Sequence, residues 1–357
     1  MQSVEASGKK RDRTFDIARG LGMILIIMGH TFTNGAFKPY AFTTGAVIHA
    51  VSLMAFAANL PIFFVVSGYF YREKRLPDVI KGGVNTLLVP YVAANAIWLV
   101  INLAFNFTNL KTGLLSILFG FGSVGMTIHN TFVPPIGALW FLIALFLATI
   151  IFQIVMKIKI WPLRTIAIVI MFSIGAWLGT QQPLPWSIAA VLQSQIYLYF
   201  GMLWANAMKR VYLNAKLVKI VLGFIGLGFW VLSARSGAYW LNIGVANNVI
   251  LATLGGIGSS LMLIMVGQLF ATNKFGVLPS DVGRYSILVL IVHVLEMPLF
   301  DRIVVHFVPL LRVHMNIFLV IAVFFVLRVV FDVVLAMVLR RVPVVEMMFL
   351  KRDFPLK

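Results

Sequence analysis

The feature that most restricts the fold of this sequence is its series of long apolar segments. A helix that crosses the hydrocarbon core of a bilayer needs about 20 mainly apolar residues. Hydropathy predicts ten such segments in the 357 residues, with ends uncertain by a few positions. They lie near residues 15–34, 46–70, 84–106, 136–157, 164–180, 186–207, 217–234, 245–270, 282–300 and 315–339. The sequence therefore predicts an all-α integral membrane protein, a bundle of about ten transmembrane helices.

The composition excludes several other classes of protein. Apolar residues make up 61% of the chain and charged residues only 11%, whereas soluble domains carry about 25% charged residues. The chain contains no cysteine, which excludes disulfides, thiol nucleophiles and thiolate metal sites. The net charge of +18 would suggest nucleic-acid binding in a soluble protein, but in a membrane protein Lys and Arg mark cytoplasmic loops. We therefore expect membrane lipids, and no nucleic acid, as partners.

The distribution of basic residues predicts the orientation. With the N-terminus inside, 23 of the 29 Lys and Arg residues fall on the inner side, five on the outer side, and Arg328 within a span. Such a bias predicts a multi-pass protein of the inner (cytoplasmic) cell membrane with both termini in the cytoplasm. No cleavable signal peptide is evident. Residues 1–357 are interpreted as one transmembrane domain, with cytoplasmic tails at 1–14 and 341–357.

The first span carries ionisable residues, which are costly inside a membrane and are functional candidates. Asp16, Arg19, Met23, Ile26 and His30 form one stripe at helical spacing. Arg19 and His30 are separated by about three turns, or about 16 Å. The stripe is too polar for lipid and is predicted to face the bundle interior or a water-filled cavity, with Arg19 near the cytoplasmic mouth and His30 towards the outer half. The alternatives are a His30 bonded to a neighbouring helix and an Arg19 that snorkels to the interface.

Two further pairs of residues are functional candidates because they too are ionisable and lie in a span or at its end. Arg72 and Arg75 end the second span and would share a face on a continuing helix, where their guanidinium forks could bind one polyanion; they could equally be ordinary cytoplasmic charges. His293 and Glu296 lie one turn apart in the ninth span and could assist proton transfer, or make a plain interhelical hydrogen bond. No two histidines show a metal-ligand spacing supported by carboxylates, so no metal is expected.

In order and position, several short segments resemble signatures of the membrane acyltransferase-3 family, ten-helix acyltransferases that modify cell-surface glycans. The segments are the Arg-x10-His pattern of Arg19 and His30, the second-span sequence PIFFVVSGY at 61–69, the Arg-x-x-Arg pattern of Arg72 and Arg75, the sequence GALWFL at 137–142, and the Tyr-Ser…His segment at 285–293. The segment at 137–142 is similar to the branch likened to fucose 4-O-acetylases. The resemblance covers essentially the whole chain.

The resemblance implies transfer of an acyl group, usually acetyl, from cytoplasmic acetyl-CoA to a hydroxyl of a cell-surface polysaccharide or lipid-linked sugar. His30 would act as general base or transient acyl carrier, Arg72 and Arg75 would hold the CoA phosphates, and Arg19 would line the donor channel. Moving a small neutral acyl group through a bilayer is far cheaper than moving the CoA anion. The supporting candidates are Asp16, which could orient Arg19, together with Ser67, Tyr69, Trp140, His293 and Glu296; Tyr69 and Trp140 could instead be interface anchors.

Two other functions compete with acyl transfer. A proton-coupled transporter or flippase of a small or lipid-linked substrate could use the ionisable residues of the first and ninth spans as a relay. Transporters typically contain paired broken helices related by repeats, and the sequence shows no repeat. A non-catalytic scaffold would not need a basic pair aligned beneath a buried histidine.

Overall fold

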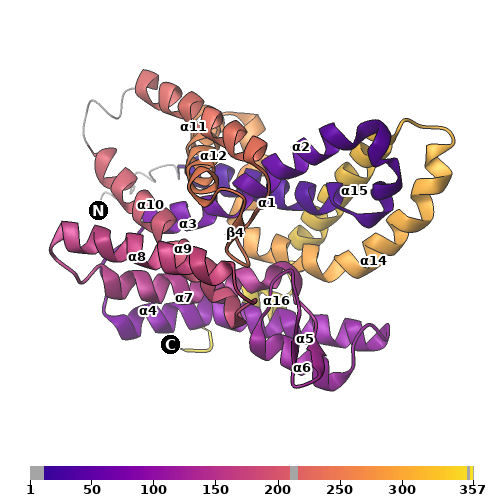
Figure 1. The fold of residues 1–357 in the computed structure, drawn as a ribbon, viewed down its shortest axis with the longest axis horizontal. Helices are drawn as coiled ribbons and strands as arrows, with labels where there is room; N and C mark the ends of the chain where they lie inside the picture. The colour runs from indigo at the N-terminus through magenta and orange to yellow at the C-terminus, as the bar shows by residue number, and fades with distance from the viewer. Residues whose placement is uncertain (1–11, 210–215, 352–353, 357) are drawn as a thin grey trace, which may run out of the picture.

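The computed structural model describes residues 12–209, 216–351 and 354–356. Residues 1–11, most of the predicted N-terminal tail, lie outside these ranges, as do parts of the predicted C-terminal tail. The fold is almost entirely helical, with two short antiparallel hairpins (Figure 1). The all-α prediction is therefore confirmed for the described part of the chain.

Among the described residues, eight helical segments are long and apolar enough to cross a membrane. They are α1 (Thr14–Phe32), Val47–Tyr69 from α2 (Ala41–Asn59) and α3 (Pro61–Tyr69), Leu76–Ala104 from α4 (Leu76–Gly83) through α5 (Val89–Ala104), Gly137–Val155 with α7 (Trp140–Val155), α8 (Trp161–Gly179), Leu217–Ser236 of α11 (Lys216–Ser236), α12 (Val249–Phe270) and α15 (Ile317–Leu339). A bent pair, Pro185–Gln193 with α9 (Ile188–Gln193) and α10 (Gln195–Ala207), would make a ninth span with a bend of 41°.

The remaining predicted span, 282–300, falls in a helix that contains several charged residues. Helix α14 (Ser286–Arg312) has 27 residues, but it carries Glu296, Asp301 and Arg302. These charges make it too polar to count as a span by composition. All ten predicted segments are thus helical, while length and composition support eight or nine membrane spans in the described chain; the expected count of ten is not confirmed.

Segments far apart in the sequence are hydrogen-bonded near the ends of several helices. The Trp186 indole donates to the Leu118 carbonyl at 2.7 Å, and the Gln193 amide donates to the Gly244 carbonyl at 2.7 Å. Leu118 lies in the short apolar helix α6 (Leu110–Phe119), and a hairpin of β1 (Met126–Ile128) and β2 (Thr131–Val133) follows it. The second hairpin, β3 (Tyr239–Trp240) with β4 (Val245–Ala246), flanks Gly244. These two bonds connect the start of α9 to α6 and its end to the second hairpin.

The C-terminal residues do not form a simple tail. Helix α16 (Pro343–Phe349) follows α15 and buries Phe349. The Asn85 side chain donates to the Leu356 carbonyl at 2.7 Å and accepts from the Leu356 amide at 3.1 Å. Asn85 lies in a π-helical turn, Val84–Leu88, between α4 and α5. The end of the chain is thereby held against the segment that follows Arg72 and Arg75.

Helix α1 occupies the interior of the bundle, where it packs against α2, α12, α13 (Val277–Arg284) and the α14–α15 pair (Figure 1). Asp16, Met23 and Ile26 are all buried, which confirms that the predicted stripe faces protein. The packing with α13 is close because glycines meet at the contact: a Cβ at Gly283 would overlap the Asp16 carbonyl, and one at Gly20 would overlap the Pro279 carbonyl. The position of α1 therefore depends on backbone contact at its N-terminal end.

This contact predicts that Gly283→Ala destabilises the protein. The added methyl group has no space without a backbone shift, which typically costs about 1–3 kcal/mol. Gly82→Ala is the matched control, because a Cβ at Gly82 meets nothing within 4 Å. Thermal unfolding in detergent should show a lower midpoint for the Gly283 variant only; equal midpoints would contradict the close packing.

Candidate active site

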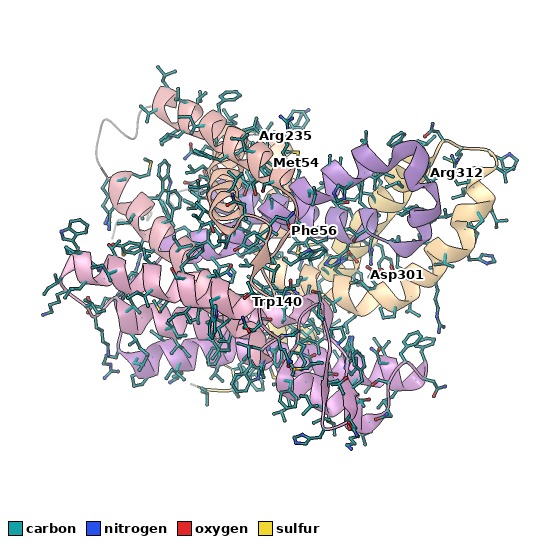
Figure 2. All side chains as sticks on the ribbon, in the orientation of Figure 1. Met54, Phe56, Trp140, Arg235, Asp301 and Arg312 are labelled. Carbon is teal, nitrogen blue, oxygen red and sulfur yellow. The ribbon has the colours of Figure 1, made fainter. Side chains whose placement is uncertain are left out.

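His30 lies near the C-terminal end of α1, between an aromatic ring and a second histidine. Its ring meets Phe56 edge-on with centroids 5.7 Å apart, and the His293 ring lies at 5.4 Å. Gly29 lets the Phe56 ring approach α1, since a Cβ there would lie 3.0 Å from that ring. Phe56 also contacts Trp240 of the second hairpin at 5.4 Å, and Figure 2 shows Phe56 near the centre of the molecule. His30 is half-buried and thus lies at the boundary between core and outer loops.

His293 is oriented by two carboxylates. Its Nδ1 lies 2.9 Å from Asp332 Oδ2 and 3.3 Å from Glu296 Oε1, and all three side chains are buried. Since both partners are carboxylates, Nδ1 carries the hydrogen and this tautomer is fixed. His293 Nε2 is buried without a hydrogen-bond partner among the described residues. It is therefore the nitrogen left for chemistry beside His30.

A buried arginine compensates the two carboxylates. Arg328, 1% exposed, donates from Nε to Glu296 Oε1 at 2.6 Å and lies over the Phe300 ring at 4.7 Å. Its Nη2 is 3.9 Å from Asp301 Oδ1, and Asp301 accepts from the Asn34 amide at 2.8 Å. Asp301 is itself a residue of α14, and Figure 2 shows it away from Phe56. Arg328 therefore joins the His293 pair to polar groups farther along α14.

The formal charges of this cluster favour proton uptake. Among the buried groups, Glu296 and Asp332 as carboxylates carry −2 and Arg328 carries +1, so their sum is −1 with a neutral His293 and zero with its imidazolium; Asp301, 3.9 Å from Arg328, is left out of this sum because its side chain is 45% exposed. In a low-dielectric interior, an excess charge is expensive and a balanced set is favoured. The arrangement is suited to accept a proton at Nε2 of His293 and to stabilise the resulting cation, as a carboxylate does for histidine in nucleophilic catalysis.

His293, Glu296 and Asp332 also place ligand atoms within 4.8 Å of one another, close enough to hold a metal ion. His293 and Glu296 were candidates from their spacing, whereas Asp332 joins them from a different helix, α15. Two contacts oppose a cation here: His293 Nδ1 is hydrogen-bonded by the carboxylates that would bind the ion, and Arg328 already lies 2.6 Å from Glu296. The charge and bonding of the set fit a proton site better than a metal site.

At the N-terminal end of α1, Arg19 and Asp16 form the predicted ion pair, with Nη2 and Oδ1 2.6 Å apart. The Arg19 side chain is 32% exposed and that of Asp16 is 5% exposed. Between Arg19 and His30, Met23 and Ile26 are buried at 0% and 3% exposure. These two side chains are closely packed, so a donor route along this face would require them to move.

Comparison with known proteins agrees with the sequence patterns. The sequence model described as an acyltransferase domain, that of the acyltransferase-3 family, matches residues 12–337. The chain belongs to the acyltransferase-3 family. Two curated relatives are both nodulation protein NolL: that of Mesorhizobium japonicum is 24% identical over 174 residues, 48% of this chain, and that of Sinorhizobium fredii is 27% identical over 171 residues, 47% of this chain. Each match covers 44% of the relative's length, and no solved structure matches the chain.

In this acyltransferase-3 chain the Arg-x-x-Arg pattern is not helical, and the expected shared face of Arg72 and Arg75 is wrong. Helix α3 ends at Tyr69 and residues 71–75 are irregular before α4 begins at Leu76. Pro77 explains the break, because its ring would clash with the carbonyl of the fourth preceding residue in a continuous helix and suits a first turn instead. Both arginines are exposed. Arg75 forms a forked pair with Asp78, with contacts of 2.9 and 3.2 Å.

The other predicted site residues, Trp140, Ser67 and Tyr69, lie in different surroundings. Trp140 is 4% exposed, so it is a core residue and not an anchor in the interface. The Ser67 hydroxyl donates to the Phe63 carbonyl at 2.7 Å. Tyr69 stacks at a tilt against Phe15 with centroids 4.3 Å apart. None of these contacts joins the His30 cluster.

Sequence reasoning missed Asp332 and Arg328 as site residues, although a signal existed. Both are ionisable and lie four residues apart in the predicted span 315–339, so they share a helix face. The rule that selected Asp16 and His30 would have selected this pair too. Asp301 and Phe56 carried no comparable signal, because only the tertiary contacts bring them near the histidines.

The cluster predicts that Arg328→Met strongly destabilises the protein, by about 3–5 kcal/mol, since removing one partner leaves uncompensated buried charge. Arg328→Met combined with Glu296→Gln should recover much of the loss. Thermal unfolding in detergent measures the stability of the single and the double variant.

The same measurement tests for a bound metal ion, and EDTA should leave the wild-type midpoint unchanged. A midpoint that falls with EDTA would favour a metal ion at His293, Glu296 and Asp332.

Proposed function

We propose that this protein is a membrane O-acyltransferase that moves an acyl group, acetyl in the first instance, from cytoplasmic acyl-CoA to a hydroxyl of a cell-surface or lipid-linked glycan. Family membership supports acyl transfer. The names of the matched relatives, both nodulation proteins, are compatible with a surface-exposed product. The observation that carries the proposal is the pairing of His30 with His293, which is itself bonded to Asp332.

In the proposed reaction, His30 acts as the base for the acceptor hydroxyl or as a transient acyl carrier. In either route the thioester C–S bond breaks, an ester C–O bond forms, and the hydroxyl proton ends on the departing thiolate. His293 Nε2 is adjacent to His30 and could hold this proton between the two events. Glu296 and Asp332 would then stabilise the His293 imidazolium. His30 is the proposed catalytic residue, and Asp332 is a positioning residue that acts through His293.

The donor end of the reaction is proposed at the other end of α1. Arg19, fixed by Asp16, would line the entrance, while the exposed Arg72 and Arg75 would contact the CoA phosphates. Arg75 would exchange its Asp78 partner for phosphate, which is a cheap exchange because exposed ion pairs contribute little. Met23 and Ile26 separate the entrance from His30, and the flexible Met23 side chain is suited to move aside.

Proton-coupled transport remains the second candidate because of two specific observations. The buried His293–Asp332 and Arg328–Glu296 pairs are of the kind that transporters use as relays. The α9–α10 pair is bent by 41°, as expected for a broken transporter helix. This function predicts substrate-driven proton movement without cleavage of a thioester.

Replacement of His30 with Ala is expected to lower acyl transfer or thioester hydrolysis by about 10²–10⁴-fold, since it removes the base or nucleophile. Purified protein in nanodiscs, incubated with acetyl-CoA, reports this as release of free thiol. His314→Ala is the matched control, because His314 is exposed in an outer loop. Unchanged thiol release in the His30 variant would reject its catalytic role, and proton flux without thiol release would favour transport.

Replacement of Asp332 with Asn should lower kcat by up to about 10⁴-fold with little change in the KM for acetyl-CoA, because the His293 tautomer is no longer fixed. Glu346→Gln, at an exposed position on α16, is the control. Steady-state kinetics separates the two parameters. A rise in KM without loss of kcat would place Asp332 outside the proton path.

A further inference from the structure

A second region of the molecule, distant from His30, has the form of a ligand site. A cavity of about 460 Å³ opens between the ends of α1, α3, α10, α11 and α12. This volume is in the range of small-molecule sites. All of these helix ends were predicted to be cytoplasmic, and none of the residues that line the cavity takes part in the His30 cluster.

Aromatic side chains form its walls. Phe15 and Tyr69 pack against each other with centroids 4.3 Å apart, and both line the cavity. Trp204 lines it from α10 and stacks nearly parallel to Phe200, with centroids 6.3 Å apart. All three lining rings are half-buried, so each has part of its surface available. Aromatic faces of this kind bind the flat face of a nucleobase.

The polar residues of the cavity match the rest of a nucleotide. Lys219 is the cation among the lining residues, and Gln268 supplies a carboxamide. A lysine ammonium binds phosphate as a point charge, and a glutamine amide pairs with the donor and acceptor edge of adenine. Asp12, the acidic lining residue, accepts a hydrogen bond from the Thr14 amide at 2.9 Å, so it is engaged at the start of α1.

The cavity lies on the path that the donor must take. Phe15 is one turn before Arg19 and shares its face of α1. Arg72 follows Tyr69 by three residues of irregular chain, which places it within about 10 Å. His30 is fifteen residues from Phe15, or about 22 Å along the helix, so a ligand held here can deliver a reactive group to His30 only through a long arm.

We propose that the cavity lined by Phe15, Tyr69, Trp204, Lys219 and Gln268 binds the adenine nucleotide end of acyl-CoA, with the pantetheine arm directed along α1 towards His30. This inference rests on the proposed function and deepens it by assigning the donor's head group to a defined site. Stacking and the lysine hold the head, while Arg19 and Arg72 meet the diphosphate and the arm beyond it.

The test is equilibrium binding of radiolabelled acetyl-CoA to the full-length protein in nanodiscs. Adenosine 3′,5′-bisphosphate, which carries the head without the arm, should compete with acetyl-CoA. Trp204→Leu should weaken acetyl-CoA binding about 5- to 100-fold, the range for loss of one stacked base, and Lys219→Gln and Gln268→Leu should also weaken it. All three variants should bind acetyl-pantetheine, which lacks the nucleotide, as tightly as wild type does.

The matched controls are Trp177→Leu and Lys159→Gln, at exposed positions outside the cavity; both should bind acetyl-CoA normally.

If wild type binds acetyl-CoA but the bisphosphate does not compete, or the cavity variants bind as wild type does, the nucleotide site is overturned while acyl-CoA dependence stands. If wild type binds no acetyl-CoA, the donor in the proposed function is wrong. If a Trp204 variant misfolds and also loses acetyl-pantetheine binding, Lys219→Gln and Gln268→Leu decide the question.

Discussion

The compensation of buried charge is the constraint on which the rest of this structure depends. Arg328, Glu296, Asp332 and His293 lie inside an apolar helix bundle, where an isolated charge is very costly. They are tolerated because Arg328 meets Glu296 at 2.6 Å and His293 meets Asp332 at 2.9 Å. These contacts join α14 to α15 and fix the orientation of the imidazole nearest to His30. One network therefore supports both the packing of the bundle and the chemistry proposed for it.

Helix α1 connects this network to the opposite side of the molecule. Its N-terminal end is held against α13 by glycine contacts and carries the Asp16–Arg19 pair. Its C-terminal end presents His30 between Phe56 and His293. A rigid helix thus keeps Arg19, at the proposed donor entrance, and His30, at the proposed reaction centre, about 16 Å apart. Such a separation suits a reaction whose charged donor stays on one side while a small neutral group crosses.

The fold was largely predictable because its main cause is local. Ten apolar segments became ten helical regions, and the spacing of Asp16, Met23 and Ile26 placed them on one buried face, along which Arg19 and His30 are half-buried. Two expectations failed for identifiable reasons. Pro77 prevents a helix through Arg72 and Arg75, and the charges of α14 reduce the number of segments that qualify as spans. The C-terminal segment also folds into α16 and bonds to Asn85, a long-range contact that no local pattern indicated.

The sequence by itself determined the class of protein, the helices and the identity of the candidate histidines, because hydrophobic runs and helical periodicity are properties of neighbouring residues. Family membership followed from motifs that are equally local. The tertiary structure alone decided that His293 is paired with Asp332, that Arg328 compensates Glu296, and that Phe15, Tyr69 and Trp204 enclose one cavity. Those contacts join residues tens to hundreds of positions apart, and their partners are chosen by which helices pack together. The proposed proton site and nucleotide site exist only after the bundle has assembled.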